Sequence, residues 1–182
     1  MALLERGDPV VEDHAQSIFG GVRFETDLST HAMECVILIG LPASGKSTFF
    51  RERFAGTHDH VSKDLLRNHR KPQRRQEHLI AESLASGRSI VVDNTNPSAA
   101  VRAPLIAIAK KHGAEVSGYF FLTEAGDALR RNRARQGRER VPDVAIFTVR
   151  KRLEPPNAAE GFDRLFTVRL NEAERTFEVS PL

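Results

Sequence analysis

A glycine-rich segment that contains one lysine is the part of the sequence with the clearest chemistry. The segment and the residue after it are Gly40-Leu41-Pro42-Ala43-Ser44-Gly45-Lys46-Ser47-Thr48. The first eight residues match the pattern G-x-x-x-x-G-K-[ST], in which glycines let backbone N–H groups surround a phosphate. The lysine of that pattern bridges two phosphates and the next hydroxyl contacts Mg²⁺. Residues 40–48 therefore predict a site for a nucleoside triphosphate and Mg²⁺, with Lys46 and Ser47 in these two roles.

A carboxylate at the end of a second apolar run is the next candidate. Ser89-Ile90-Val91-Val92 precedes Asp93, and proteins with such a phosphate loop often carry an acid near the bound Mg²⁺ at the end of a strand. Aspartate in this position is also a common turn former or helix cap, and Asn96-Pro97 is a helix start. The pattern leaves both roles open, and the phosphate loop favours Asp93 as a second Mg²⁺ ligand beside Ser47.

Asp64 and Arg67 are three residues apart, so they share one face of a helix that begins at Ser62. A carboxylate there could accept the proton of an attacking hydroxyl, while the arginine holds an anionic group of the acceptor. The same spacing fits a helix-start acid with its salt-bridge partner. The spacing does not decide between these two interpretations.

Arginine supplies most of the 27 basic residues, and many arginines lie in two blocks, residues 67–75 and residues 130–140. The formal net charge is +3 and the pI is about 9.3, which is compatible with a polyanionic partner. Arginine holds phosphate oxygens in pairs, so one block could face a triphosphate and the other a second phosphorylated ligand. The block with Arg131 and Arg135 ends in a loop, as expected of a lid. The alternative for each block is a solvated helix face.

Short apolar runs alternate with longer amphipathic stretches from residue 34 onward, which indicates a parallel sheet covered by helices. The expected strands are residues 34–39, 58–61, 89–93, 115–122 and 164–170. The expected helices are residues 46–54, 64–86 with a break at Pro72, 97–112, 124–135 and 142–154. Parallel strands direct their carboxyl ends to one crevice, where the candidate residues should meet. We expect an α/β domain over residues 34–182 and an N-terminal arm of unknown role over residues 1–33.

Composition excludes several other classes of protein. The 182 residues, 40% hydrophobic and 28% charged, are typical of one soluble domain. No apolar run approaches the roughly 20 residues of a membrane-spanning helix, and no secretory leader is evident. One cysteine, Cys35, allows no internal disulfide. We therefore expect a cytoplasmic protein without a membrane partner.

Five segments together resemble the kinase domain of polynucleotide 5′-hydroxyl kinases. They are the phosphate loop, Ser62-Lys63-Asp64, Asp93-Asn94-Thr95-Asn96-Pro97, the arginine lid and the string Glu154-Pro155-Pro156-Asn157-Ala158-Ala159-Glu160-Gly161-Phe162. The similarity is to the kinase half of animal polynucleotide kinase/phosphatase and covers about residues 35–170. Many unrelated kinases share the phosphate loop, so the other strings carry most of the resemblance.

The resemblance implies a P-loop kinase-like three-layer sandwich with a five-stranded parallel sheet and an arginine-rich lid. It also implies transfer of the γ-phosphate of ATP, with Mg²⁺, to the 5′-hydroxyl end of DNA or RNA in nucleic-acid repair. Asp64 matches the general base and Arg67 the arginine that grips the acceptor's 3′-phosphate. Arg135 matches the lid arginine at the β-phosphate and transition state, with Arg131 as its helper.

Two alternatives to this function stay open. A P-loop kinase of a nucleoside or another small metabolite has the same fold and the same loop. A nucleotide-dependent binding module without turnover would also carry the loop. The sequence shows no phosphatase motif and no ligase domain, so we expect phosphatase or ligase partners to be separate proteins.

Overall fold

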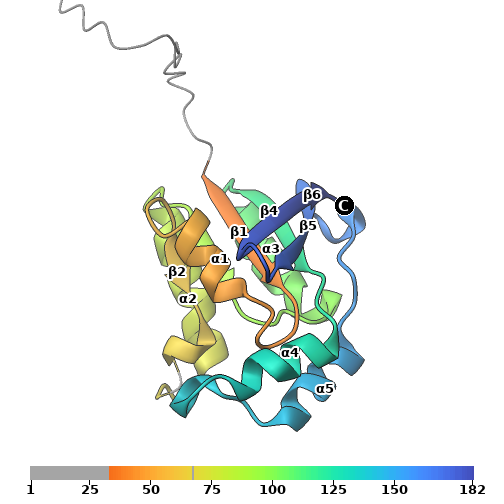
Figure 1. The fold of residues 1–182 in the computed structure, drawn as a ribbon. Coiled ribbons are helices and arrows are strands. Elements are labelled where there is room, and N and C mark those ends of the chain that lie inside the picture. Colours follow the sequence, from red (N-terminus) through yellow and green to blue (C-terminus); the bar gives the residue numbers. More distant parts are fainter. Residues whose placement is uncertain (1–32, 67) are drawn as a thin grey trace, which may run out of the picture. The chain divides into compact units, whose positions relative to one another are not determined.

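The computed structural model describes residues 33–66 and 68–182 (Figure 1). Residues 1–32 of the expected arm, and Arg67, lie outside the described residues. The strands form one sheet in the order β2-β3-β1-β4-β5-β6, in which the first five are parallel and β6 is antiparallel to β5. Their bounds are Glu34–Ile39 for β1, Asp59–Val61 for β2, Ile90–Asp93 for β3, Glu115–Phe121 for β4, Arg164–Asn171 for β5 and Thr176–Pro181 for β6.

Five α-helices and three short 3-10 helices connect the strands of the described part. The α-helices are α1 Lys46–Arg53, α2 Pro72–Ala85, α3 Ala99–Lys111, α4 Ala125–Arg133 and α5 Asp143–Arg152, and the 3-10 helices are η1 Lys63–Leu66, η2 Gly137–Glu139 and η3 Ala158–Glu160. Helices α2 and α3 cover one face of the sheet, and α1 covers the other. Helices α4 and α5 pack together beside the loop that follows β1 (Figure 1). This confirms the expected three-layer α/β fold. Among the described residues, no helix combines the length and apolar character needed to cross a bilayer.

Strand β1 is buried on both of its faces. Cys35, Ile37 and Ile39 point to the α2 and α3 side, whereas Val36 and Leu38 pack on the α1 side. A parallel sheet covered by helices on both faces needs such a continuous apolar strand. The loop after β1 therefore starts from a strand at the centre of the core.

The sheet has one strand more than the five that we predicted. Strand β6 returns along β5 through a tight turn in which Arg175 has a φ of 55°. Its apolar and polar residues alternate, which is typical of a strand in a hairpin. The prediction considered only strands that alternate with helices and therefore did not include β6. Phe177 of this strand is buried against Phe49 of α1, with ring centroids 5.2 Å apart. The extra strand therefore extends the core toward the start of α1.

The predicted helix over residues 64–86 is broken at Pro72, as expected, but its first part is only the 3-10 turn η1. Proline lacks a backbone N–H, so it suits the first turn of α2, where that group has no helical partner. The His69 N–H donates to the Leu66 carbonyl at 2.9 Å, which closes the turn between η1 and α2. Asp64 is thus in a short turn directly after β2.

Candidate phosphate-binding site

The glycine-rich loop connects β1 to α1 at the carboxyl end of the sheet. Its start is fixed to the end of β3, because the Gly40 N–H donates to the Thr95 carbonyl at 3.0 Å. Gly45 has a φ of 99°, and a Cβ there would lie 3.1 Å from Cε1 of Phe177. Glycine suits this position for two reasons. Residues with a side chain rarely adopt this backbone conformation, and a side chain here would press against Phe177 of β6.

Lys46 is buried, and its ammonium group turns back into the loop. It donates to the carbonyls of Gly40 at 3.1 Å and Leu41 at 2.5 Å, and to Ser44 Oγ at 3.2 Å. Burial lowers the pKa of Lys46 to about 8; the charge of Asp93 opposes this shift, Arg135 adds to it, and Asp64 opposes it. The charges of these three residues, which come from separate elements, therefore all act on one ammonium group.

The expected partner residues of Mg²⁺ are in contact with each other. Ser47 Oγ donates to Asp93 Oδ2 at 2.6 Å. Burial would raise the pKa of Asp93, but hydrogen bonds from His60 and Ser47 and the charge of Lys46 hold the pKa below its ordinary value. The described residues contain no group of three or more His, Cys, Asp or Glu that could hold a metal alone. Ser47 and Asp93 thus suit a Mg²⁺ ion whose other oxygen ligands are phosphate and water.

His60 is a site residue that the sequence analysis missed. Its Nε2 lies 3.1 Å from Asp93 Oδ2, and its ring stacks on Phe50 with centroids 4.1 Å apart. The contact depends on the pairing of β2 with β3, which aligns His60 with Val91. Residue spacing along the chain gives no signal for it.

Asp64 is exposed on η1, and Asn94 fixes the position of this turn. The Lys63 N–H donates to Asn94 Oδ1 at 2.9 Å, and Asn94 Nδ2 donates to Gln76 Oε1 at 3.2 Å. One side chain at the end of β3 therefore holds both η1 and α2. Arg67 is outside the described residues, so its position beside Asp64 stays a prediction.

Arg102, also missed, links the two sequence strings that carry the family resemblance. This fully buried residue donates to both carboxylate oxygens of Glu160 at 2.7 Å and to the carbonyls of Asn96 and Glu154 at 3.1 Å. Asn96 Nδ2 in turn donates to the Leu38 carbonyl of β1 at 2.8 Å. Through Arg102 and Asn96, these two strings are linked to β1, the strand that leads into the phosphate loop. Several of their residues therefore have a structural role.

Four arginines of the expected lid, Arg130, Arg131, Arg133 and Arg135, have carboxylate or carbonyl partners. Arg131 donates through Nε to the Ala43 carbonyl of the loop at 2.8 Å and forms an ion pair with Glu172. Glu172 also accepts from Arg130 at 2.6 Å, and these two arginines hold its pKa below the ordinary value. Arg135 donates to the Glu139 carbonyl at 3.4 Å.

Arg131 and Arg135 border the same hollow, which also touches Ala43, Gly45 and Thr48. Leu170 and Phe177 of the C-terminal hairpin form its other wall. The lid helix α4 and the hairpin therefore enclose the outer side of the loop.

Comparison with known proteins confirms the resemblance to polynucleotide kinases. The chain is 28% identical over 134 residues to the bifunctional polynucleotide phosphatase/kinase of Schizosaccharomyces pombe, covering 71% of this chain and 32% of that protein. It is 29% identical over 142 residues to a putative bifunctional polynucleotide phosphatase/kinase of Acanthamoeba polyphaga mimivirus, covering 74% and 33%. The chain thus spans about a third of the length of each relative.

Solved structures share the fold. A chain of the Pnkp1/Rnl/Hen1 RNA repair complex is 22% identical with a TM-score of 0.57, covering 85% of this chain and 50% of that one. A gluconokinase from Sinorhizobium meliloti is 22% identical with a TM-score of 0.56, covering 78% and 86%. A family model described as an AAA domain matches residues 35–156, most of the chain. The chain therefore belongs to this AAA domain family and has a P-loop kinase-like fold.

Proposed function

We propose that this kinase transfers the γ-phosphoryl group of ATP to the 5′-hydroxyl end of a DNA or RNA strand. One observation carries the proposal: Lys46 is buried in the phosphate loop, and the next residue, Ser47, contacts Asp93 at 2.6 Å. The charges of Asp93, of the lid residue Arg135 and of Asp64 also act on Lys46, which corresponds to the residue that touches the phosphates in P-loop kinases. Such a site has residues that could bind the phosphate donor and a carboxylate that could activate the acceptor.

The donor side would be formed by residues 40–48. Backbone N–H groups of the loop and Lys46 would hold the phosphates, and Ser47 and Asp93 would hold Mg²⁺, which neutralises charge on the phosphate oxygens when bound. Arg135, with Arg131 as helper, would stabilise the charge that develops on the transferred group.

The acceptor side would depend on Asp64. Its carboxylate would accept the proton of the attacking hydroxyl while an oxygen–phosphorus bond forms to the γ-phosphorus and the bond to the β-phosphate oxygen breaks. Asp64 is exposed, so an incoming hydroxyl can reach it. Arg67 would hold the phosphate next to the reacting nucleotide. The roles proposed for Asp64 and Arg67 rest on their match to polynucleotide kinases and on the exposed position of Asp64 after β2.

The second candidate is a kinase of a small metabolite. It is favoured by the similarity to the gluconokinase, but that likeness concerns the fold alone. The named activity of the two curated relatives and the basic segment beside Asp64 favour a nucleic acid. The curated relatives are named as bifunctional phosphatase/kinases, so we propose separate phosphatase or ligase proteins as partners of this chain.

An acceptor panel tests the proposal. The protein is incubated with γ-labelled ATP and Mg²⁺ and offered 5′-hydroxyl DNA or RNA oligonucleotides, nucleoside 3′-monophosphates, free nucleosides, gluconate or no acceptor. We expect label on the oligonucleotides, and none on an oligonucleotide that already has a 5′-phosphate. Label on gluconate or nucleosides but not on oligonucleotides would overturn the proposal.

A further inference from the structure

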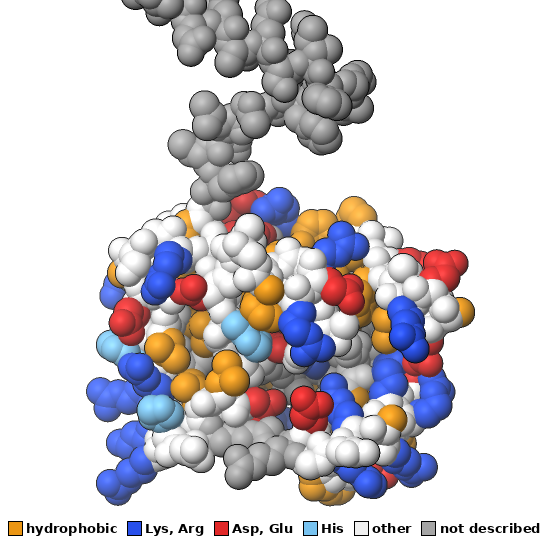
Figure 2. All heavy atoms as spheres, turned by 60° about the vertical axis from the view of Figure 1, so that its left-hand side comes forward, with side chains coloured by type: hydrophobic (Ala, Val, Ile, Leu, Met, Phe, Trp, Pro, Cys, Tyr) orange, Lys and Arg blue, Asp and Glu red, His pale blue; other side chains and the backbone are white. Residues whose placement is uncertain are grey.

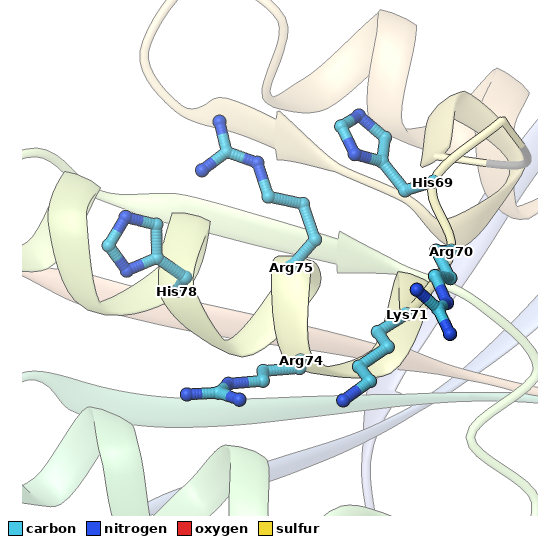
Figure 3. Close-up of a pocket in the computed structure, with 6 residues that line it drawn as sticks. All are labelled: His69, Arg70, Lys71, Arg74, Arg75 and His78. Carbon is cyan, nitrogen blue, oxygen red and sulfur yellow. The ribbon is translucent and has the colours of Figure 1, made fainter.

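A group of basic side chains borders an open hollow at the start of α2 (Figure 3). Its members, which we call the α2 basic surface, are His69, Arg70, Lys71, Arg74, Arg75 and His78. Positions 71, 74, 75 and 78 follow the spacing of one helix face, and the opposite face, with Gln76 and Ile80, is buried. The residues that line the hollow are all basic, and the apolar parts of their side chains form most of its wall.

Carboxylates of the described residues neutralise almost none of the positive charge on the α2 basic surface. Among the described residues, no carboxylate forms an ion pair with Arg70, Lys71, Arg74 or Arg75, and only His78 approaches one, Glu82, at 3.8 Å. Arg70, Lys71, Arg74 and Arg75 lie within one short stretch of the chain, with their charged ends spread in different directions (Figure 3). An external polyanion would lower the repulsion among these permanent cations. This charge is therefore available to a ligand.

Hydrogen bonds also connect the helix that carries this surface, α2, to the turn that carries Asp64, the proposed base. Gln76, on the buried face of α2, accepts from Asn94, which also accepts from Lys63 beside Asp64. In Figure 2, basic side chains gather on two sides of a hollowed face that has acidic side chains between them. Residues 69–71 lie between η1, which carries Asp64, and the start of α2, so the surface begins a few residues from Asp64 along the chain.

We propose that the α2 basic surface binds the backbone phosphates of the acceptor strand beyond its terminal nucleotide. This inference rests on the proposed function and names its substrate more closely, as a polynucleotide rather than a nucleoside 3′-monophosphate. Arginine forks grip phosphates without regard to base, so DNA and RNA strands would both bind. Contacts of this kind release counterions, which makes the affinity fall as salt rises.

The test compares two triple variants that remove the same charge. Arg70→Gln/Lys71→Gln/Arg74→Gln removes three exposed cations of the surface, and Arg53→Gln/Lys111→Gln/Arg169→Gln removes three exposed cations from α1, α3 and β5. Binding of a fluorescein-labelled twelve-nucleotide 5′-hydroxyl strand, DNA or RNA, is followed by anisotropy between about 50 and 200 mM KCl. Transfer to that strand and to a nucleoside 3′-monophosphate is measured in parallel.

We expect the surface variant to bind the strand about tenfold more weakly at low salt and to lose about 2 from its log–log salt slope, at about 0.7 per lost phosphate contact. The Michaelis constant (KM) for the mononucleotide should change by less than about twofold, and the control variant should match the wild type. Equal losses in both variants, or equal KM changes for strand and mononucleotide, would overturn the inference. Strand binding that depends on the surface without any transfer would retain the surface and reject the proposed function.

Discussion

The two arginine blocks look alike in sequence and differ in their surroundings. In the lid block, Arg131 and Arg130 share Glu172 and Arg133 pairs with Asp143. In the α2 block, Arg70, Arg74 and Arg75 have no carboxylate partner among the described residues. Carboxylates hold Arg130, Arg131 and Arg133 in place, and Arg131 also contacts the phosphate loop, which suits a small ligand of fixed shape. Unpaired arginines suit a long anion that can bind in several registers. On this comparison we propose that the lid block faces the donor and that the α2 block faces the acceptor strand.

The lid half of the comparison is tested most strongly by Arg135→Ala. We expect the turnover number (kcat) to fall about 10²- to 10³-fold, because a charge-stabilising group at the transferred phosphate is lost. The KM for the oligonucleotide should stay nearly constant. Steady-state kinetics with both substrates varied measures this, and a large rise in the oligonucleotide KM would move Arg135 to the acceptor side.

A pH series separates the two regions by the chemistry of their cations. The pKa of Lys46 is about 8, below the ordinary value of a lysine, chiefly because the group is buried. In the nucleotide-free protein its charge is complete below this pH and is lost as the pH rises through it. ATP affinity should therefore fall by up to about tenfold per pH unit above 8. Arginines do not titrate there, so strand binding should change far less.

Titration calorimetry with ATP at several pH values, and anisotropy with the oligonucleotide, give the two profiles. Lys46→Arg is the matched control, because its charge persists across the range. A flat ATP profile in the wild type would show that Lys46 stays charged throughout.

The carboxylate of the lid block is tested by Glu172→Gln. We expect the KM for ATP to rise about three- to fivefold, since Arg131 loses the partner that orients it against the Ala43 carbonyl. Glu178→Gln on β6 is the control, because it removes an exposed carboxylate that forms no ion pair among the described residues. Tighter ATP binding in Glu172→Gln would mean that Glu172 competes with the phosphates for Arg131.

The converse change gives the α2 block a carboxylate. Lys71→Glu places an acid three and four residues before Arg74 and Arg75, where it can pair with them. We expect strand binding about threefold weaker than in Lys71→Gln, which removes the cation without adding the acid. Anisotropy at low salt measures the ratio, and equal binding by the two variants would show that free arginines are not what the strand needs.

Parts of this site could be predicted because their signals are local. The phosphate loop and Asp93 each follow an apolar strand, so parallel topology brings them to the same edge of the sheet. His60, Arg102 and Glu172 could not be predicted in this way, because each acts on a residue more than thirty positions away. The contact of His60 depends on strand pairing, that of Arg102 on the packing of η3 against α3, and that of Glu172 on the turn between β5 and β6.

The difference between the two arginine blocks could not be predicted from the sequence either. Both blocks are basic segments beside helices, and the sequence shows several acids near the lid block without saying which side chains meet. Glu172, the partner of Arg130 and Arg131, comes from the extra hairpin, whose second strand was not expected. Missing β6 therefore also meant missing the carboxylate that organises the lid.

The central claim, that Asp64 accepts the proton of a nucleic-acid 5′-hydroxyl, is tested most directly by Asp64→Asn. The substitution keeps the size of the side chain and removes its ability to act as a base. With γ-labelled ATP and a 5′-hydroxyl oligonucleotide, we expect kcat to fall about 10²- to 10⁴-fold, while ATP affinity by calorimetry changes little. Near wild-type transfer by this variant would contradict the account.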